Sequence, residues 1–109
     1  MKYIIKESRL DELVQNFITS QVGLLESHSS PTFGHTYIWY NNLNGVMLFE
    51  ISDTDYHGVG LGVLESMWNV VKGMFSLSDN DTDKAFIKWM SNYSAKKRDF
   101  EGVYTFENG

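Results

Sequence analysis

Apolar residues at helical spacing mark the first recognisable element of the chain. They form one stripe of a 3.6-residue period, made of Leu10, Leu13, Val14, Phe17 and Ile18. Ser8 stands where the cap of such a helix belongs, and Asp11 and Glu12 suit the positive end of its dipole. The pattern therefore predicts an amphipathic helix that starts at Ser8 and ends at or just before Gly23.

Two later segments repeat this helical pattern. Residues 63–75 predict a second amphipathic helix, whose apolar side consists of Leu64, Met67, Trp68, Val71, Met74 and Phe75. Residues 76–80 break the pattern, and Asp81 or Thr82 is expected to cap a third helix. The stripe of that helix consists of Ala85, Phe86, Trp89, Met90 and Tyr93. Its last turn is expected to hold the cations that suit the negative end of a helix dipole, Lys96, Lys97 and Arg98.

Between the first and second helices, the pattern changes to that of strands. Residues 35–40 and 46–52 are rich in β-branched and aromatic residues, and they flank a turn whose Asn44-Gly45 pair tolerates positive φ. This predicts a β-hairpin. Both strands carry apolar residues on both faces, which is typical of strands covered on both sides. We therefore expect the hairpin to lie at the centre of a sheet, with helices on at least one face.

The remaining segments give weaker signals. Residues 2–6 predict a short strand, residues 24–30 are ambiguous between strand and loop, and Pro31 is expected to break the chain because proline lacks a backbone donor. A turn after Asp53 leads into a glycine-rich strand or loop, and residues 103–106 predict a closing strand. Together the elements predict an α+β fold: an antiparallel sheet around a central β-hairpin, with one N-terminal helix and a C-terminal helical pair packed on it.

Composition limits the class of protein. A chain of 109 residues with 42% hydrophobic and 15% aromatic residues is expected to form a single domain over residues 1–109 and not to be disordered. The absence of cysteine excludes disulfides, thiol nucleophiles and thiolate metal sites. No segment has the length of apolar residues that a signal peptide or a membrane span needs. We therefore expect a cytoplasmic protein without membrane contact.

The net charge of -5 is unevenly spread along the chain. Residues 31–83 contain one basic residue, Lys72, against seven acidic ones, whereas the C-terminal part is mildly basic. Nucleic-acid binding requires a concentrated positive field, so the acidic middle disfavours it. One alternative function remains open, a nucleic-acid-binding accessory protein that uses the cluster Lys96, Lys97 and Arg98.

A second alternative is a metal-binding domain or metal-dependent enzyme. In extended backbone, residues two apart share a face, so Asp53, Asp55 and His57 are able to offer two oxygens and one nitrogen to a divalent ion. The competing interpretation is an ordinary turn, because aspartates after strands cap nearby backbone amides. His35 is the only further ligand that the hairpin suggests.

Two other motifs resemble binding loops but have simpler interpretations. The glycines of residues 58–62 precede a predicted helix, yet their spacing fits neither a dinucleotide fingerprint nor a phosphate loop. Alternate glycines are instead expected to clear one strand face for an aromatic such as Trp68 or Trp89. Residues 79–83 imitate the start of a calcium loop, but Lys84 and Met90 replace its glycine and closing glutamate. Helix capping is the better interpretation of that segment.

The opening of the chain carries a family resemblance. Residues 2–10 read Lys-Tyr-Ile-Ile-Lys-Glu-Ser-Arg-Leu, which resembles the start of many small uncharacterised proteins of tailed phages and marine viral metagenomes. Trp68, residues 74–77 and residues 87–89 are also similar to such proteins. The resemblance implies a viral genomic setting and therefore the host cytoplasm, and it carries no catalytic or binding residue.

These observations favour a non-enzymatic function. No serine lies in a nucleophile-elbow pattern, and His28, His35 and His57 are an ordinary number of histidines. The surplus of aromatics is mainly explained by a core, and some of them are expected to anchor a protein partner: Tyr37, Trp39, Tyr40, Tyr56, Trp68, Trp89 and Tyr104. We expect a small binding or assembly protein that needs no cofactor and acts through protein contacts or as a homo-oligomer.

Overall fold

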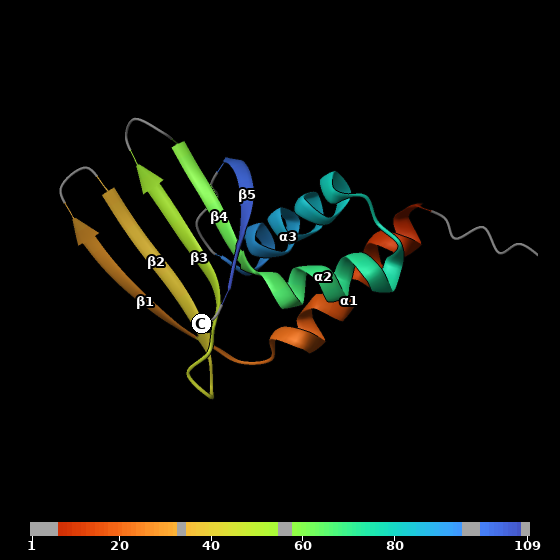
Figure 1. Ribbon diagram of the computed structural model, residues 1–109, viewed down its shortest axis with the longest axis horizontal. Helices are drawn as coiled ribbons and strands as arrows, with labels where there is room; N and C mark the ends of the chain where they lie inside the picture. The colour runs from red at the N-terminus through yellow and green to blue at the C-terminus, as the bar shows by residue number, and fades with distance from the viewer. Residues whose placement is uncertain (1–6, 33–34, 55–57, 95–98, 108–109) are drawn as a thin grey trace, which may run out of the picture.

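One helix, four strands, two helices and a last strand follow one another in the described part of the chain (Figure 1). The structure is a computed structural model that describes residues 7–32, 35–54, 58–94 and 99–107. The predicted strand at residues 2–6 lies outside these residues. The elements are α1 (Glu7–Val22), β1 (Leu25–Thr32), β2 (His35–Asn42), β3 (Met47–Thr54), β4 (Gly58–Leu64), α2 (Glu65–Phe75), α3 (Asp79–Tyr93) and β5 (Phe100–Phe106).

The five strands form one sheet in the order of the chain, β1-β2-β3-β4-β5. The strands β1 to β4 pair with one another in antiparallel fashion, whereas β5 is parallel to β4. Parallel neighbours require a long crossover, and α2 and α3 supply it. The predicted α+β fold, with its N-terminal helix and C-terminal helical pair, is therefore confirmed, and the parallel closing strand is its one departure from an antiparallel sheet.

The central hairpin is confirmed as β2 and β3. The side-chain Oδ1 of Asn42 accepts hydrogen bonds from the backbone N–H groups of Asn44 and Val46, each at 2.9 Å. Gly45 has a φ of 81°, which is the left-handed conformation that the Asn-Gly pair predicts. Because β3 is the middle strand of five, the hairpin lies at the centre of the sheet as expected.

The ambiguous segment after the first helix is the edge strand β1. It pairs with β2 along its whole length, including Pro31 opposite Thr36, so the break expected at Pro31 is wrong. The physical reason is that β1 has a sheet neighbour only on one side, where an edge strand tolerates a residue without an N–H group.

The core lies between the sheet and the helices. Figure 1 shows the helices grouped together on one side, nearest β4 and β5, with β1 farthest from them. The Phe49 ring of β3 stacks on Trp89 at 5.2 Å between centroids and lies 6.2 Å from Phe86. The fully buried hydrophobic side chains come from β3, β4 and all three helices: Ile18, Phe49, Ile51, Leu61, Val63, Val71, Phe86 and Met90.

The first two helices start at residues slightly different from those predicted. The first helix starts at Glu7, one residue before the expected cap at Ser8, and Gly23 follows its end with a φ of 63°. The second helix starts at Glu65, because Val63 and Leu64 belong to β4. Met74 is 60% exposed and thus does not belong to the buried side that helical spacing assigned to it.

The third helix is capped by Ser78, so the expected caps Asp81 and Thr82 are wrong. The Oγ of Ser78 accepts a hydrogen bond from the Asp81 backbone N–H at 3.1 Å, and the Thr82 hydroxyl donates to the Ser78 carbonyl at 2.8 Å. The helix ends at Tyr93, where Ser94 is extended. The last turn therefore contains no basic residue, and the expected cations at residues 96–98 fall beyond it and outside the described residues.

Within the described residues, no helix combines the length and the apolar character needed to cross a lipid bilayer.

Truncation of the central core residue tests this arrangement. Phe49→Ala is expected to lower the free energy of unfolding by about 3–5 kcal/mol, because it removes a fully buried ring and leaves a cavity against α3. Val70→Ala, at a side chain that is 46% exposed, is expected to change it by less than about 0.5 kcal/mol. Urea denaturation measures both variants. Equal losses of stability would contradict this placement of the core.

Candidate binding site on the open face of the sheet

The two faces of the sheet carry different side chains. Successive residues of a strand point to opposite faces, so Glu50, which lies between the buried Phe49 and Ile51 of β3, points away from the helices. We call this second side the open face. The strand register places one residue from each strand in a single row across it, which we call the aromatic row: His28, Trp39, Glu50, Gly62 and Tyr104.

A carboxylate lies at the centre of the aromatic row. The Tyr37 hydroxyl donates a hydrogen bond to one oxygen of the half-buried Glu50, and the Tyr104 hydroxyl donates to the other. The three residues come from β2, β3 and β5, so the arrangement depends on strand pairing over a long stretch of chain. Glu50 is thereby fixed between two neutral donors.

Both tyrosines are held in their neutral form. Burial, with the hydrogen bond to Glu50 and its negative charge as further causes, raises the pKa of Tyr37 from 10 to about 12. The same causes raise the pKa of Tyr104 further. At neutral pH the two hydroxyls therefore act only as protonated donors to Glu50.

The alternate glycines of β4 make room for Tyr104. A Cβ added at Gly62 would lie 2.8 Å from the Tyr104 ring and 2.5 Å from the Glu50 Cγ, and one added at Gly60 would lie 3.5 Å from that ring. The prediction that an aromatic side chain lies over these glycines is confirmed, but that side chain is Tyr104 rather than Trp68 or Trp89. Those two residues belong to helices, whose side chains meet the opposite face of the sheet.

The other aromatics of the open face pack against one another. The His28 ring stacks on the Trp39 indole at 5.4 Å between centroids and 18° between planes. Tyr37 lies at 5.4 Å from the same indole, tilted by 33°. Trp39 is half-buried and Tyr104 is 41% exposed, so the aromatic row offers ring surface to a partner.

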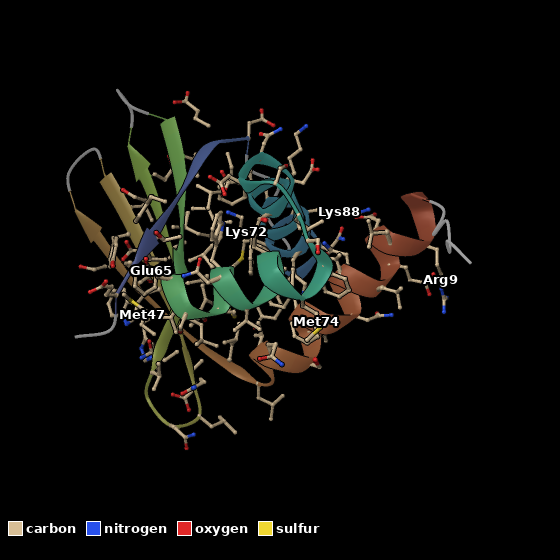
Figure 2. All side chains as sticks on the ribbon, turned by 45° about the vertical axis from the view of Figure 1, so that its right-hand side comes forward. Arg9, Met47, Glu65, Lys72, Met74 and Lys88 are labelled. Atoms are coloured by element: carbon tan, nitrogen blue, oxygen red, sulfur yellow. The ribbon has the colours of Figure 1, made fainter. Side chains whose placement is uncertain are left out.

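The open face is acidic. The sequence has no Lys or Arg between Arg9 and Lys72, and none of the five described strands contains either residue. By alternation with His28, Glu26 lies on the open face, and the Glu101 side chain lies where a Cβ of Gly58 would point. The labelled cations Arg9, Lys72 and Lys88 lie among the helices in Figure 2.

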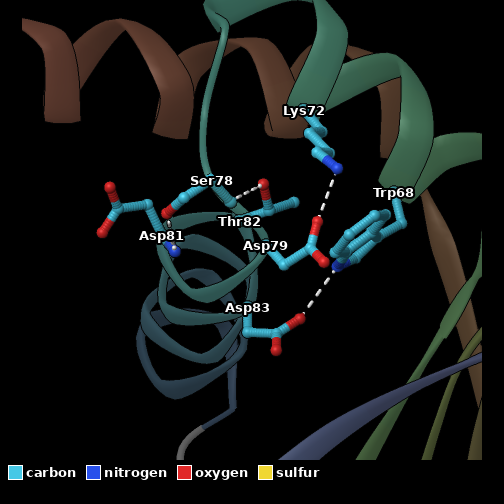
Figure 3. Close-up of polar contacts among 7 residues, drawn as sticks. All are labelled: Trp68, Lys72, Ser78, Asp79, Asp81, Thr82 and Asp83. Atoms are coloured by element: carbon cyan, nitrogen blue, oxygen red, sulfur yellow. Dashed lines mark hydrogen bonds and ion pairs between the residues drawn. The ribbon is translucent and has the colours of Figure 1, made fainter.

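The acidic segment at the start of α3 has a structural role (Figure 3). Asp79 forms an ion pair with Lys72 at 2.5 Å, and Asp83 accepts a hydrogen bond from the Trp68 indole at 2.9 Å. The Lys72 Nζ also lies 5.4 Å from the centre of the Trp68 ring. These contacts join α2 to α3, and the helical course of the segment favours the interpretation as a helix start over that as a calcium loop.

The metal and nucleic-acid alternatives stay predictions. Asp53 is half-buried in β3 opposite Thr36 and Val59, but Asp55 and His57 lie outside the described residues. Among the residues that are described, no three side chains of His, Asp or Glu gather in a way that suits a metal ion. The basic cluster of the nucleic-acid alternative, Lys96, Lys97 and Arg98, also lies outside them.

Sequence analysis missed Glu50 as the centre of the open face. Its signal was present, because Glu50 interrupts an otherwise apolar run from Val46 to Ile51. The partners Tyr37 and Tyr104 are separated by most of the chain, and only the strand order brings them to the same carboxylate.

Two matched glycine substitutions test the packing of Tyr104. Gly62→Ala is expected to destabilise the fold by about 1–3 kcal/mol, because its methyl group would overlap Tyr104 and Glu50. Gly60→Ala places the same methyl group at an ordinary contact distance and is expected to change stability by less than about 0.5 kcal/mol. Thermal or urea unfolding compares them. If Gly60→Ala were the more harmful of the two, this packing would be wrong.

The raised tyrosine pKa values predict loss of stability at high pH. Between pH 10 and about 12 the folded chain keeps the Tyr37 proton that the unfolded chain has lost, so folding is disfavoured as pH rises through this range. The contribution of Tyr37 to the free energy of unfolding is fully present below pH 10. Glu50→Gln removes the negative charge and is expected to lower the pKa of Tyr37 part of the way towards 10, leaving the contribution of burial. Tyrosinate absorbance measures the ionisation. A pKa near 10 for every tyrosine of the native chain would contradict the contacts of Tyr37 and Tyr104 with Glu50.

Comparison with known proteins adds no assignment to this geometry. No protein-family model matches the chain, and neither a curated protein nor a solved structure matches it. The candidate site accordingly rests on the residues of the open face alone.

Proposed function

We propose that this chain is a small non-enzymatic binding protein that acts through protein contacts on the open face of its sheet. The observation that carries the proposal is the aromatic row, which joins exposed ring surface to a carboxylate on the side of the sheet opposite the helices. A phage or viral setting is part of the proposal and rests on the resemblance of residues 2–10.

Aromatic side chains support a protein partner. Trp and Tyr are enriched among the residues that anchor protein interfaces, because they bury a large rigid surface and keep a polar group. Trp39 and Tyr104 lie in the same row, on either side of Glu50 and Gly62. Anchors held in this way by strand pairing lose little conformational freedom on binding.

The charge of the open face supports a basic partner. Glu26 and Glu50 lie on it, and the described strands contribute no Lys or Arg. Complementary charge accelerates association and suppresses partners of the same sign. We therefore infer that a basic segment of a partner protein occupies the open face.

The same charge argues against nucleic acid on this face. Aromatic platforms that stack bases work together with a positively charged groove that follows the phosphates. The open face offers the opposite sign, so a nucleic-acid function would depend on residues 96–98 alone.

A binding titration tests the proposal. The probe is a fluorescently labelled twelve-residue peptide in which Lys and Arg alternate with Gly, compared with a peptide that carries Glu in their place. The basic peptide is expected to bind and the acidic one not to bind. Trp39→Ala is expected to weaken binding at least tenfold, about 1.4 kcal/mol, because it removes an anchor from the aromatic row.

The control is Met74→Ala, which truncates a side chain of α2 that is 60% exposed and lies on the helical side (Figure 2). It is expected to leave the affinity unchanged. Absence of binding by the basic peptide, or equal losses in both variants, would overturn the proposal. So would self-association that Trp39→Ala abolishes in the absence of peptide binding, because the occupant would then be a second copy of this chain.

A further inference from the structure

We propose that the aromatic row receives one arginine side chain of the partner, with its guanidinium bonded to Glu50 and packed against the rings beside it. This inference rests on the proposed function and names the chemistry by which the open face would select its partner. The observations that carry it are the hydrogen bonds of Glu50, the positions of the described cations Arg9, Lys72 and Lys88, and the spacing of the row.

Glu50 keeps the capacity to accept further hydrogen bonds. A carboxylate has about four acceptor positions, two on each oxygen. Tyr37 and Tyr104 each occupy one position, on different oxygens. Both oxygens therefore retain a position for an incoming donor, and the two hydroxyls hold the carboxylate plane in one orientation.

The negative charge of Glu50 has only neutral partners among the contacts described. Three of the described cations are engaged elsewhere, since Arg9 lies 3.6 Å from Glu12, Lys72 pairs with Asp79 and Lys88 pairs with Asp11. All of these lie on helices rather than on the open face. A half-buried charge loses hydration without gaining a counter-charge, and a cation supplied by a partner would compensate it.

The spacing of the row favours arginine over lysine. Trp39 lies directly opposite Glu50 on the neighbouring strand, a separation of about 5 Å between Cβ atoms, so one side chain is able to contact both. A guanidinium is planar, donates two parallel hydrogen bonds to a carboxylate and stacks on aromatic rings. An ammonium is a compact, strongly hydrated charge that matches neither the two oxygens nor the ring surface as well.

Tyr104 completes the other side of the row. Its ring lies over Gly62 and its hydroxyl holds Glu50, while 41% of the side chain stays exposed. The carboxylate is therefore flanked by ring surface from β2 and from β5. This arrangement gives a flat side chain apolar contact beside its ion pair, which an isolated surface glutamate does not offer.

Three peptides of equal length separate the possibilities. They carry Arg, Lys or the neutral isostere citrulline at the same positions between glycines, and their affinities are measured by fluorescence anisotropy. The native chain is expected to bind the Arg peptide at least tenfold more tightly than the Lys peptide and not to bind the citrulline peptide. Glu50→Gln is expected to lower the ratio of Arg to Lys affinity at least threefold, because it removes the paired hydrogen bonds and leaves only the ring contact to favour Arg.

A matched control removes the same charge elsewhere on the open face. Glu26→Gln is expected to weaken both basic peptides equally and to keep the preference for Arg, because Glu26 lies outside the aromatic row. Thermal unfolding verifies that each variant is folded. If Glu50→Gln does not fold, Trp39→Leu provides a second route, since it removes the ring beside Glu50 and is expected to reduce the Arg preference while Lys binding persists.

The outcomes distinguish this inference from the proposed function. Equal affinity of the native chain for the Arg and Lys peptides, or an Arg preference that Glu50→Gln leaves undiminished, would overturn the arginine site and leave a basic partner on the open face. Absence of binding by both basic peptides would overturn the inference together with the proposed function.

Discussion

In the described part of the chain the sheet has helices on one face only, and the rest of the structure depends on how the central strand meets this constraint. Phe49 and Ile51 of β3 are fully buried against the helical layer, while Glu50 between them points the other way. Since none of the described helices covers the open face, its side chains make their contacts with one another. They do so through ring contacts around Trp39 and through the hydrogen bonds of two tyrosines to a single carboxylate.

The glycine-rich strand and the acidity of the sheet follow from the same constraint. Position 62 is a glycine because the Tyr104 ring lies over it and reaches Glu50, which leaves no room for a Cβ. The glycines of residues 58–62, which resemble a nucleotide-binding loop in sequence, therefore make room for an aromatic ring. The described cations lie on the helices, where Lys72 and Lys88 join one helix to another. The helical side therefore contains the core, whereas the open face is aromatic and negatively charged.

Local signals in the sequence predict the elements well, but they do not determine which strands meet. Periodicity identified the three helices, and Asn44-Gly45 identified the hairpin, since both depend on neighbouring residues. The cap at Ser78, the strand through Pro31 and the parallel β5 depend on tertiary context. Apolar residues on both faces of the hairpin predicted that both faces would be covered by other elements. On the open face, however, the aromatic side chains Tyr37 and Trp39 pack against each other instead. Glu50 became a candidate only when the register placed Tyr37 and Tyr104 beside it.

We propose that the open face, rather than the helical side, binds a basic partner. Amide chemical shifts recorded during titration with a basic peptide test it most directly, because they locate the contact on the folded chain. We expect the largest changes in β2, β3 and β5 around the aromatic row, including the indole N–H of Trp39, and little change in α1 and α2. Changes concentrated on the helices, with the Trp39 indole unaffected, would contradict it.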